Sequence, residues 1–148
     1  MTARKRVLFL CTRNSARSQM AEGWLRALGG ARYDVESAGT EATRVHPLAI
    51  RAMGEVGIDL AGHRSKTLDR FRDDRWDWVI TVCDDANERC PIFPGAVRRE
   101  HWSFQDPSRA VGSDDERLTT FRAVRDQIRA RVEGWLAQPT ATSATVPR

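Results

Sequence analysis

The sequence predicts an α/β protein with a single-domain, open, parallel four-stranded sheet and helices on both faces. Short apolar runs alternate with helical patterns along the chain, which is typical of strand–helix–strand units. The runs at 7–10 and 78–82 are apolar at nearly every position, as strands buried on both faces require. Cys11 and Cys83 each follow one of these runs. We therefore expect both thiols at the carboxyl edge of the sheet, where such folds bind their ligands.

The other elements follow from apolar periodicity and from turn and cap residues. A first helix begins at Ser18 and stops at Gly29-Gly30, and Pro47 opens a second one. A capping box at 113–116 opens a long last helix. One face of that helix carries Leu118, Phe121, Val124, Ile128, Val132 and Trp135. We expect the remaining strands at 33–38 and 97–102 and a short helix at 67–72.

Length and composition fit one globular domain. The 148 residues are 41% hydrophobic and 30% charged, which indicates a folded rather than a disordered chain. We expect the catalytic domain to span 1–137 and the stretch 138–148, rich in Thr, Ser, Ala and Pro, to be a disordered tail. No apolar run approaches the roughly 20 residues of a membrane span, and the N-terminus does not resemble a signal peptide. The sequence therefore predicts a cytoplasmic protein with no membrane partner, and we expect a monomer.

The net charge of +4 comes almost entirely from arginine. Nucleic-acid binding is one reading of such a charge. However, acidic residues interleave with the arginines, as in the stretch 69–75, which favours a mixed, solvated surface. We therefore predict no nucleic-acid partner and a modest positive bias that helps an anionic substrate to approach.

The loop between the first strand and the first helix has the pattern Cys-x5-Arg-Ser. Backbone N–H groups of a loop that enters a helix converge on one point and bind tetrahedral oxyanions. At that point they and Arg17 would stabilise a Cys11 thiolate, and the planar guanidinium would grip two oxygens of the anion. The expected substrate-binding residues are Thr12, Arg13, Asn14, Ser15, Ala16, Arg17 and Ser18. The alternative is that Cys11 is a buried structural thiol at the end of a strand.

A second pair of cysteines, Cys83 and Cys90, encloses a segment of turn and helix-cap residues, DDANER. In a cytoplasmic protein, cysteines are more often catalytic or metal-bound than stapled in disulfides. A thiol pair that can close a disulfide is the favoured reading. Zinc, with His63 or His101 as further ligands, is the alternative, although the spacing is wider than that of a usual zinc half-site.

Asp106 stands before Pro107, which by default indicates a turn aspartate. If the fold brings its carboxyl group to the Cys11 loop, it could protonate a leaving oxygen as a general acid. Sequence spacing does not decide between these readings. We expect the histidines His46, His63 and His101 to be structural or surface residues.

Taken together, several motifs resemble those of the thioredoxin-coupled arsenate reductases, which share the fold of low-molecular-weight tyrosine phosphatases. The resemblance runs from Val7 to about Leu136. The first motif is common to reductases and phosphatases, whereas the segments around Cys83–Cys90 and before Asp106 are more specific to reductases. The motifs are CTRNSARSQMAEGW, ESAGT, GIDLAGHRSKTL, VCDDANERCPIFPG, REHWSFQDPSR and FRAVRDQIRARVEGW.

The resemblance implies a mechanism. Cys11 attacks arsenate held by the loop and Arg17, and Asp106 protonates the departing oxygen. Cys83 then attacks Cys11, which releases arsenite and forms a disulfide, and Cys90 moves that disulfide to Cys83–Cys90. Thioredoxin reduces the bridge, so no tightly bound cofactor is expected. Phosphate and sulfate would act as substrate analogues, and a mycothiol- or glutaredoxin-type donor is the alternative to thioredoxin.

This chain departs from the family pattern at three positions. Ala16 stands where many members have a further cysteine, and Arg13 stands where glycine is usual. Arg13 could add positive charge at the mouth of the pocket or restrict entry. Some members bind potassium beside the loop with residues that match Asn14, Glu22, Ser37 and position 66. Position 66 is an acid in those members and lysine here, so we expect no bound metal. Instead, we expect the ammonium group of Lys66 to take the place of the ion and to pair with Glu22. The alternative is that Lys66 is an ordinary surface lysine.

Two other functions stay open. A tyrosine phosphatase would use only Cys11, Arg17 and Asp106. A non-catalytic redox-sensing or metal-binding module would show no turnover. The reductase is favoured because Cys83 and Cys90 have no use in phosphatase chemistry.

Overall fold

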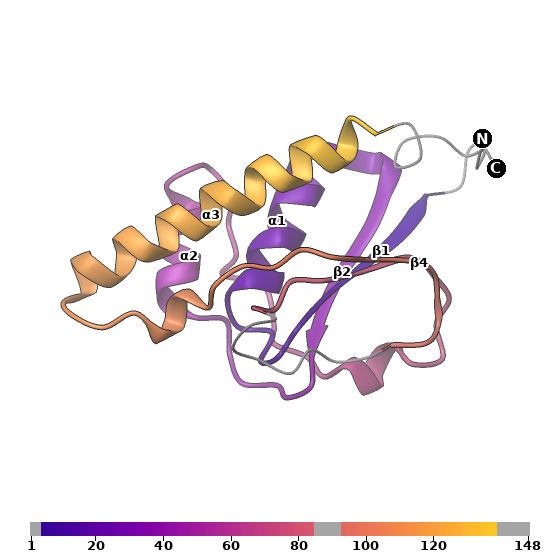
Figure 1. Cartoon of the computed structure of the whole chain (residues 1–148), viewed down its shortest axis with the longest axis horizontal. Coiled ribbons are helices and arrows are strands. Elements are labelled where there is room, and N and C mark those ends of the chain that lie inside the picture. Colours follow the sequence, from indigo (N-terminus) through magenta and orange to yellow (C-terminus); the bar gives the residue numbers. More distant parts are fainter. Residues whose placement is uncertain (1–3, 85–92, 139–148) are drawn as a thin grey trace.

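A computed structural model of the chain describes residues 4–84 and 93–138. Four parallel strands form one sheet in the order β2-β1-β3-β4. Their bounds are Lys5–Cys11 for β1, Tyr33–Gly39 for β2, Trp76–Thr81 for β3 and Ala96–His101 for β4. The predicted α/β class, the parallel sheet and the number of its strands are confirmed (Figure 1).

The central position of β1 follows from its sequence. Val7, Leu8, Phe9 and Leu10 are fully buried, because β1 has a neighbouring strand on each side and packed side chains on both faces. Alternate residues of β1 enter two separate apolar clusters, with Val7 and Phe9 in one and Leu8 and Leu10 in the other. The outer strand β4 instead alternates between half-buried and exposed residues.

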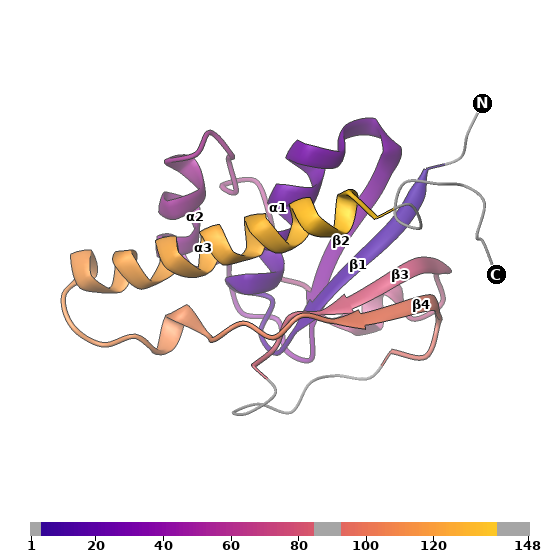
Figure 2. The ribbon, with the colours of Figure 1, turned by 45° about the horizontal axis from the view of Figure 1, so that its top comes forward.

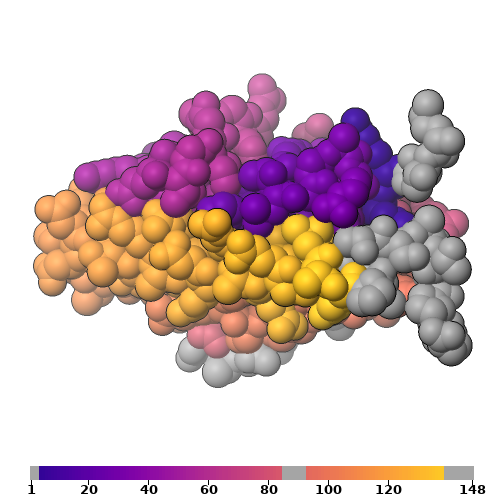
Figure 3. Space-filling model, turned by 90° about the horizontal axis from the view of Figure 1, so that it is seen from above, coloured from indigo at the N-terminus to yellow at the C-terminus, as the bar shows by residue number. Residues whose placement is uncertain are grey.

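The three α-helices pack over the cluster that contains Val7 and Phe9. They are α1 (Arg17–Gly29), α2 (Pro47–Gly54) and α3 (Asp114–Leu136). Figure 2 shows all three on the same side of the sheet, and in Figure 3 α3 crosses most of the molecule beside the other two. All six apolar residues predicted for the core-facing side of α3 are buried, and Ser113 and Glu116 form the predicted capping box.

The other face of the sheet also carries a helix, as predicted, but a short one. In the described part of the chain, its helical cover is the single 3-10 turn η2 (Leu68–Phe71), whose Leu68 and Phe71 pack with Leu8, Leu10 and Trp76. The connection from β2 to β3 moves back across β1, so a right-handed crossover has to use this second face. However, the same connection contains α2, which packs on the first face. Its other helix, the short η2, therefore covers the second face.

The carboxyl ends of β1 and β3 lie at one edge of the sheet, because the two strands are parallel neighbours with Leu10 opposite Thr81. The chain leaves β1 at Cys11 and enters α1 at Arg17, so the predicted anion loop begins at that edge. Among the residues described, no helix combines the length and the apolar character that crossing a bilayer requires. The expected boundary at 137–138 stays a prediction, and the expected tail lies almost wholly outside the described residues.

Candidate active site

Cys11 ends β1 as a free thiol, and only 2% of its surface is exposed. The backbone N–H of Asn14 donates to Cys11 Sγ at 3.2 Å, and Ser18 Oγ lies 2.9 Å from the same sulfur. Asn14 Nδ2 donates to Ser18 Oγ at 2.8 Å. Because Ser18 Oγ accepts that hydrogen bond, its own hydrogen is free to point at the sulfur. The sulfur of Cys11 thus faces two hydrogen-bond donors at the start of the loop.

Asn14 holds the loop in its shape. Its φ of 49° is in the left-handed region, which asparagine tolerates better than most residues, and its side chain is fully buried. Asn14 Oδ1 accepts from Gln19 Nε2 at 2.9 Å and from the backbone N–H of Lys66 at 2.8 Å. Asn14 Nδ2 donates to Ser37 Oγ at 2.9 Å as well as to Ser18. All four hydrogen-bonding positions of the amide are therefore used, and the loop is tied to α1, to β2 and to the segment before η2.

The structure brings Arg17 and Asp106 together across 89 positions of sequence. Arg17 is 3% exposed, and its Nη1 donates to the carbonyl of Phe104 at 3.1 Å. Its Nη2 lies 3.7 Å from Asp106 Oδ2. Ser108 donates to the other carboxylate oxygen of Asp106 from its backbone N–H at 3.0 Å and from its hydroxyl at 2.6 Å. Asp106 is thus both a turn residue that caps the short helix η3 (Pro107–Arg109) and a carboxyl group beside the loop.

The outer side of the loop rests on the segment after β2. The carbonyl of Thr12 accepts from the backbone N–H of Glu41 at 3.0 Å, and the carbonyl of Ser15 accepts from that of His46 at 2.9 Å. Gly39 has to be glycine, because a Cβ there would lie 2.6 Å from the carbonyl oxygen of Thr12. The side chain of Arg13 is exposed at this rim, and Ala16 is buried.

Cys83 follows β3 as Cys11 ends β1. The backbone N–H of Val82 donates to the carbonyl of Leu10 at 2.8 Å, which continues the strand pairing up to the two cysteines. Cys83 is fully buried and belongs to the same apolar cluster as Cys11. The structure therefore places these two cysteines at neighbouring strand ends, as the sequence predicts; Cys11 is a free thiol, and Cys83 is disulfide-bonded. Cys90 lies outside the described residues.

The expected partner of Lys66 is wrong. Lys66 Nζ donates to the carbonyl of Arg64 at 3.0 Å and lies 3.8 Å from Glu36 Oε1, not against Glu22. Glu22 instead forms an ion pair with Arg26, one helical turn further along α1. The i,i+4 spacing brings the guanidinium of Arg26 directly to that carboxylate, whereas Lys66 supports Asn14 through its backbone N–H.

Three residues near the loop were not predicted from the sequence. Gln19 is fully buried and donates to Asn14 Oδ1, and its Oε1 lies 3.0 Å from His63 Nδ1. His63 Nε2 lies 3.4 Å from Arg26 Nη1. Burial lowers the pKa of His63 from 6.5, against the opposing effect of Glu22. A polar residue on the core side of a helix was the available signal for Gln19. The sequence carried none for His63, which is 44 positions from Gln19.

Comparison with known proteins identifies the family. Residues 6–144 match the model of the low molecular weight phosphotyrosine protein phosphatases. This chain belongs to that family. Arsenate reductases from *Oceanobacillus iheyensis* and *Bacillus subtilis* are both 46% identical to this family member, over 88% and 87% of its chain and 94% and 93% of theirs. The resemblance drawn from the motifs is confirmed.

Solved structures of arsenate reductases have the same fold as this phosphatase-family chain. One in a phosphate-binding state and one in an oxidised state are each 41% identical to it, with TM-scores of 0.72 and 0.75. Each alignment covers 90% of this chain and 97% of the other. A thioredoxin-dependent arsenate reductase from *Corynebacterium glutamicum* is 27% identical, with a TM-score of 0.61, over 93% of this chain and 65% of its own.

Proposed function

We propose that this protein reduces arsenate to arsenite and is regenerated by thioredoxin. One observation carries the proposal: a buried Cys11 sulfur faces two hydrogen-bond donors in an anion loop, while Cys83 lies just beyond the end of the adjacent strand. The first feature suits attack on a tetrahedral oxyanion. The second feature supplies a further cysteine, which the hydrolysis of a phosphate ester does not require.

The first step is substitution at arsenic. Arsenate binds in the loop against Arg17, whose charge offsets that of the oxyanion. The Cys11 thiolate forms a sulfur–arsenic bond, and one oxygen leaves as water with the proton from Asp106. The contact between Arg17 and Asp106, 3.7 Å in the structure, supports this assignment because it places the acid beside the group that holds the anion.

The later steps carry the two electrons. The Cys83 thiolate attacks Cys11 Sγ, so the sulfur–arsenic bond breaks and its electron pair stays on arsenic. Arsenate becomes arsenite, and Cys11 and Cys83 are oxidised to a disulfide. Cys90 then attacks Cys83, which frees Cys11 and leaves a Cys83–Cys90 disulfide. The dithiol of thioredoxin reduces that bridge, so each turnover consumes two electrons from thioredoxin.

The family relations support the substrate and the electron donor. The relatives that are 46% identical are arsenate reductases, and a solved relative binds phosphate, which has the shape and charge of arsenate. The structure from *Corynebacterium glutamicum* is that of a thioredoxin-dependent reductase. These relations favour thioredoxin over a mycothiol- or glutaredoxin-type donor.

A phosphatase is the second candidate, because the family model that matches is that of phosphotyrosine phosphatases. It would use Cys11, Arg17 and Asp106 to form and hydrolyse a phosphocysteine. One experiment separates the two candidates: turnover of arsenate with thioredoxin, thioredoxin reductase and NADPH, run beside hydrolysis of an aryl phosphate. We expect NADPH oxidation that depends on arsenate. Strong aryl phosphate hydrolysis without arsenate turnover would identify a phosphatase instead.

A further inference from the structure

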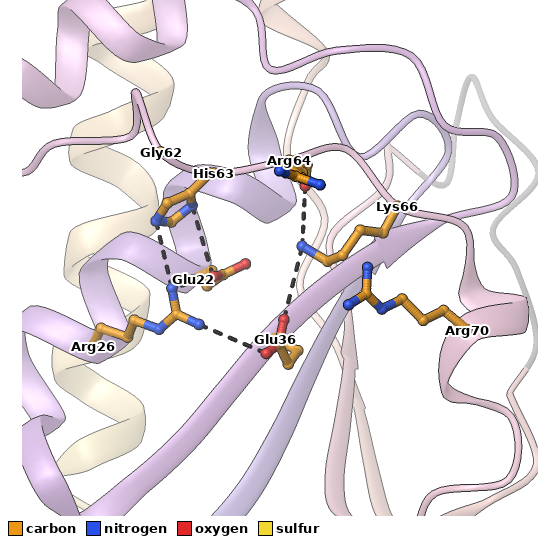
Figure 4. Close-up of a pocket in the computed structure, with 8 residues that line it drawn as sticks. All are labelled: Glu22, Arg26, Glu36, Gly62, His63, Arg64, Lys66 and Arg70. Atoms are coloured by element: carbon orange, nitrogen blue, oxygen red, sulfur yellow. Dashed lines mark hydrogen bonds and ion pairs between the residues drawn. The ribbon is translucent and has the colours of Figure 1, made fainter.

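A second polar cavity lies outside the anion loop. It encloses about 200 Å³ between α1, β2 and the segment that leads to η2 (Figure 4). None of its lining residues belongs to the loop between Cys11 and Ser18. Six charged side chains line it, together with Gly62 and His63: Glu22, Arg26, Glu36, Arg64, Lys66 and Arg70.

Cations outnumber carboxylates in this lining by four to two. His63 does not reverse the balance, because burial lowers its pKa and so favours the neutral imidazole. A concave wall with this excess of positive charge focuses its field on the space it encloses. The cavity therefore attracts an anion with about two negative charges.

The two carboxylates are already engaged by Arg26. Its guanidinium forms an ion pair with Glu22 and lies 3.9 Å from Glu36 Oε2. Ser37 donates a further hydrogen bond to Glu22 at 2.5 Å. Arg26 thus offsets one of the two negative charges, and Lys66, Arg64 and Arg70 face the other one, so an excess of positive charge remains.

Of the cations that line the cavity, Lys66 shares the carboxylate of Glu36 with Arg26, and Arg64 and Arg70 are the two without a carboxylate partner among the described residues. The side chain of Lys66 is 11% exposed, and within the described part of the chain its three N–H donors have two partners, Glu36 at 3.8 Å and the carbonyl of Arg64 at 3.0 Å. Among the described residues, neither guanidinium of Arg64 or Arg70 has a carboxylate partner, and Arg70 only lies over the ring of Phe71. In Figure 4 no dashed line reaches the guanidinium of Arg64 or Arg70.

We propose that this cavity is a second oxyanion-binding site, which takes a tetrahedral dianion of the phosphate type. Lys66 Nζ would supply the buried donor, and Arg64 and Arg70 would supply guanidinium forks that match two oxygens each. Because a water molecule takes about 30 Å³, the cavity has room for an oxyanion of five heavy atoms and some of its hydration. The site is distinct from the loop that holds the substrate.

The second site is joined to the first by Lys66. Its ammonium lines the cavity, and its backbone N–H donates to Asn14 Oδ1 at 2.8 Å. Glu22 reaches the same asparagine through Ser37. An anion bound in the cavity therefore contacts the residues that hold Asn14 in its left-handed conformation.

The test is a titration of the reduced full-length protein with inorganic phosphate, followed by the NMR signals of both sites. The amides of Asn14 and Ser15 report the loop, and the amide of Gly62 and the ring of His63 report the cavity. We expect two saturable responses with different dissociation constants. Arg64→Gln with Arg70→Gln should raise the dissociation constant of the cavity at least fivefold and leave that of the loop within twofold.

The matched control is Arg51→Gln with Arg75→Gln. It removes the same charge from two exposed arginines that do not line the cavity, and it should leave both responses unchanged. Three outcomes would overturn the proposal. The NMR signals of the cavity could show no change with phosphate, or they could change with the same dissociation constant as those of the loop. The control variant could also raise the dissociation constant of the cavity as much as the Arg64 and Arg70 variant does. The titration involves no turnover, so a failure to reduce arsenate would leave it unaffected.

Discussion

Cys11 is held by side chains that belong to three parts of the chain. The backbone N–H of Asn14 and the hydroxyl of Ser18 contact its sulfur, and Ser37 in β2 accepts a hydrogen bond from the side-chain amide of Asn14. A buried polar network stabilises a protein when each of its polar groups has a hydrogen-bond partner. Here the side-chain amide of Asn14 and the hydroxyls of Ser18 and Ser37 each have one. At the residue scale, the chemistry of Cys11 therefore depends on groups that need not touch the substrate.

The first prediction separates the nucleophile from the relay. Cys11→Ser should abolish both arsenate reduction and any aryl phosphate hydrolysis, because a hydroxyl replaces the thiolate. Cys83→Ser should abolish multiple-turnover reduction and spare hydrolysis, because hydrolysis uses only the loop. Both activities are measured on the same preparations by NADPH oxidation and by release of the phenol. Loss of hydrolysis in a folded Cys83→Ser variant would assign a structural role to that thiol.

The second prediction concerns the close approach of β2 to the loop. Gly39→Ala would bring a Cβ to 2.6 Å from the Thr12 carbonyl and 2.8 Å from the Asn14 nitrogen, so the loop has to shift. Overpacking of this kind lowers the free energy of unfolding by about 1–3 kcal/mol. We expect that loss in denaturant unfolding, with a higher KM for arsenate. Gly54→Ala is the control, because its Cβ would meet no atom within 4 Å; an equal effect there would refute the steric explanation.

Helix α2 is connected to the site through its N-cap. His46 accepts a hydrogen bond from the backbone N–H of Leu48 at 3.0 Å with Nδ1, and its ring lies 4.7 Å from that of Phe121 in α3. Its backbone N–H also supports the loop at Ser15. At the element scale, one residue therefore joins α2, α3 and the anion loop, and its protonation state affects all three.

The third prediction is a pH dependence of stability. Burial first, and then Arg117 and Arg44, lower the pKa of His46 from 6.5 in the folded protein, while Asp106 opposes them. The unfolded chain therefore binds the proton more readily, so the contribution of His46 is present above about pH 6.5 and is lost as the pH falls below it. Between pH 7 and pH 5 the wild type should lose more free energy of unfolding than His46→Asn, which keeps an N-cap acceptor. Parallel losses in urea unfolding of the two proteins would contradict this.

The proposed thiol relay belongs to the scale of the whole molecule, because Cys11 and Cys83 are far apart in the sequence and come together only through the topology of the sheet. Parallel pairing of β1 with β3 sets Cys11 and Cys83 at adjacent strand ends. The positions of Cys11 and Cys83 are compatible with the proposed first transfer between them, and Cys90 lies outside the described residues.

The fourth prediction tests that order. Treated with arsenate in the absence of thioredoxin, the wild type should accumulate a Cys83–Cys90 disulfide with Cys11 still open to alkylation. In Cys90→Ser the trapped bridge should be Cys11–Cys83, since the last acceptor is missing. Peptide mapping of alkylated protein identifies both species. A Cys11–Cys90 bridge in Cys83→Ser that supports reduction at the wild-type rate would show that Cys83 is not an obligatory carrier.

The sequence by itself determined the fold class and the loop. Buried runs that end in cysteine, a Cys-x5-Arg-Ser loop before a helix and a capping box are local patterns, and each forms from residues close together in the chain. Periodicity also identified the buried face of α3 correctly. Local chemistry was sufficient there because the interactions span only a few positions.

Only the tertiary structure decided which distant groups meet. Asp106 reaches Arg17, and the backbone of Lys66 reaches Asn14, across separations that no sequence pattern encodes. The ammonium of Lys66 pairs with Glu36 because Arg26 is closer to Glu22 along α1. The uneven cover of the sheet arose likewise, because the path of the chain from β2 to β3, not the apolar pattern, determined where its helices lie.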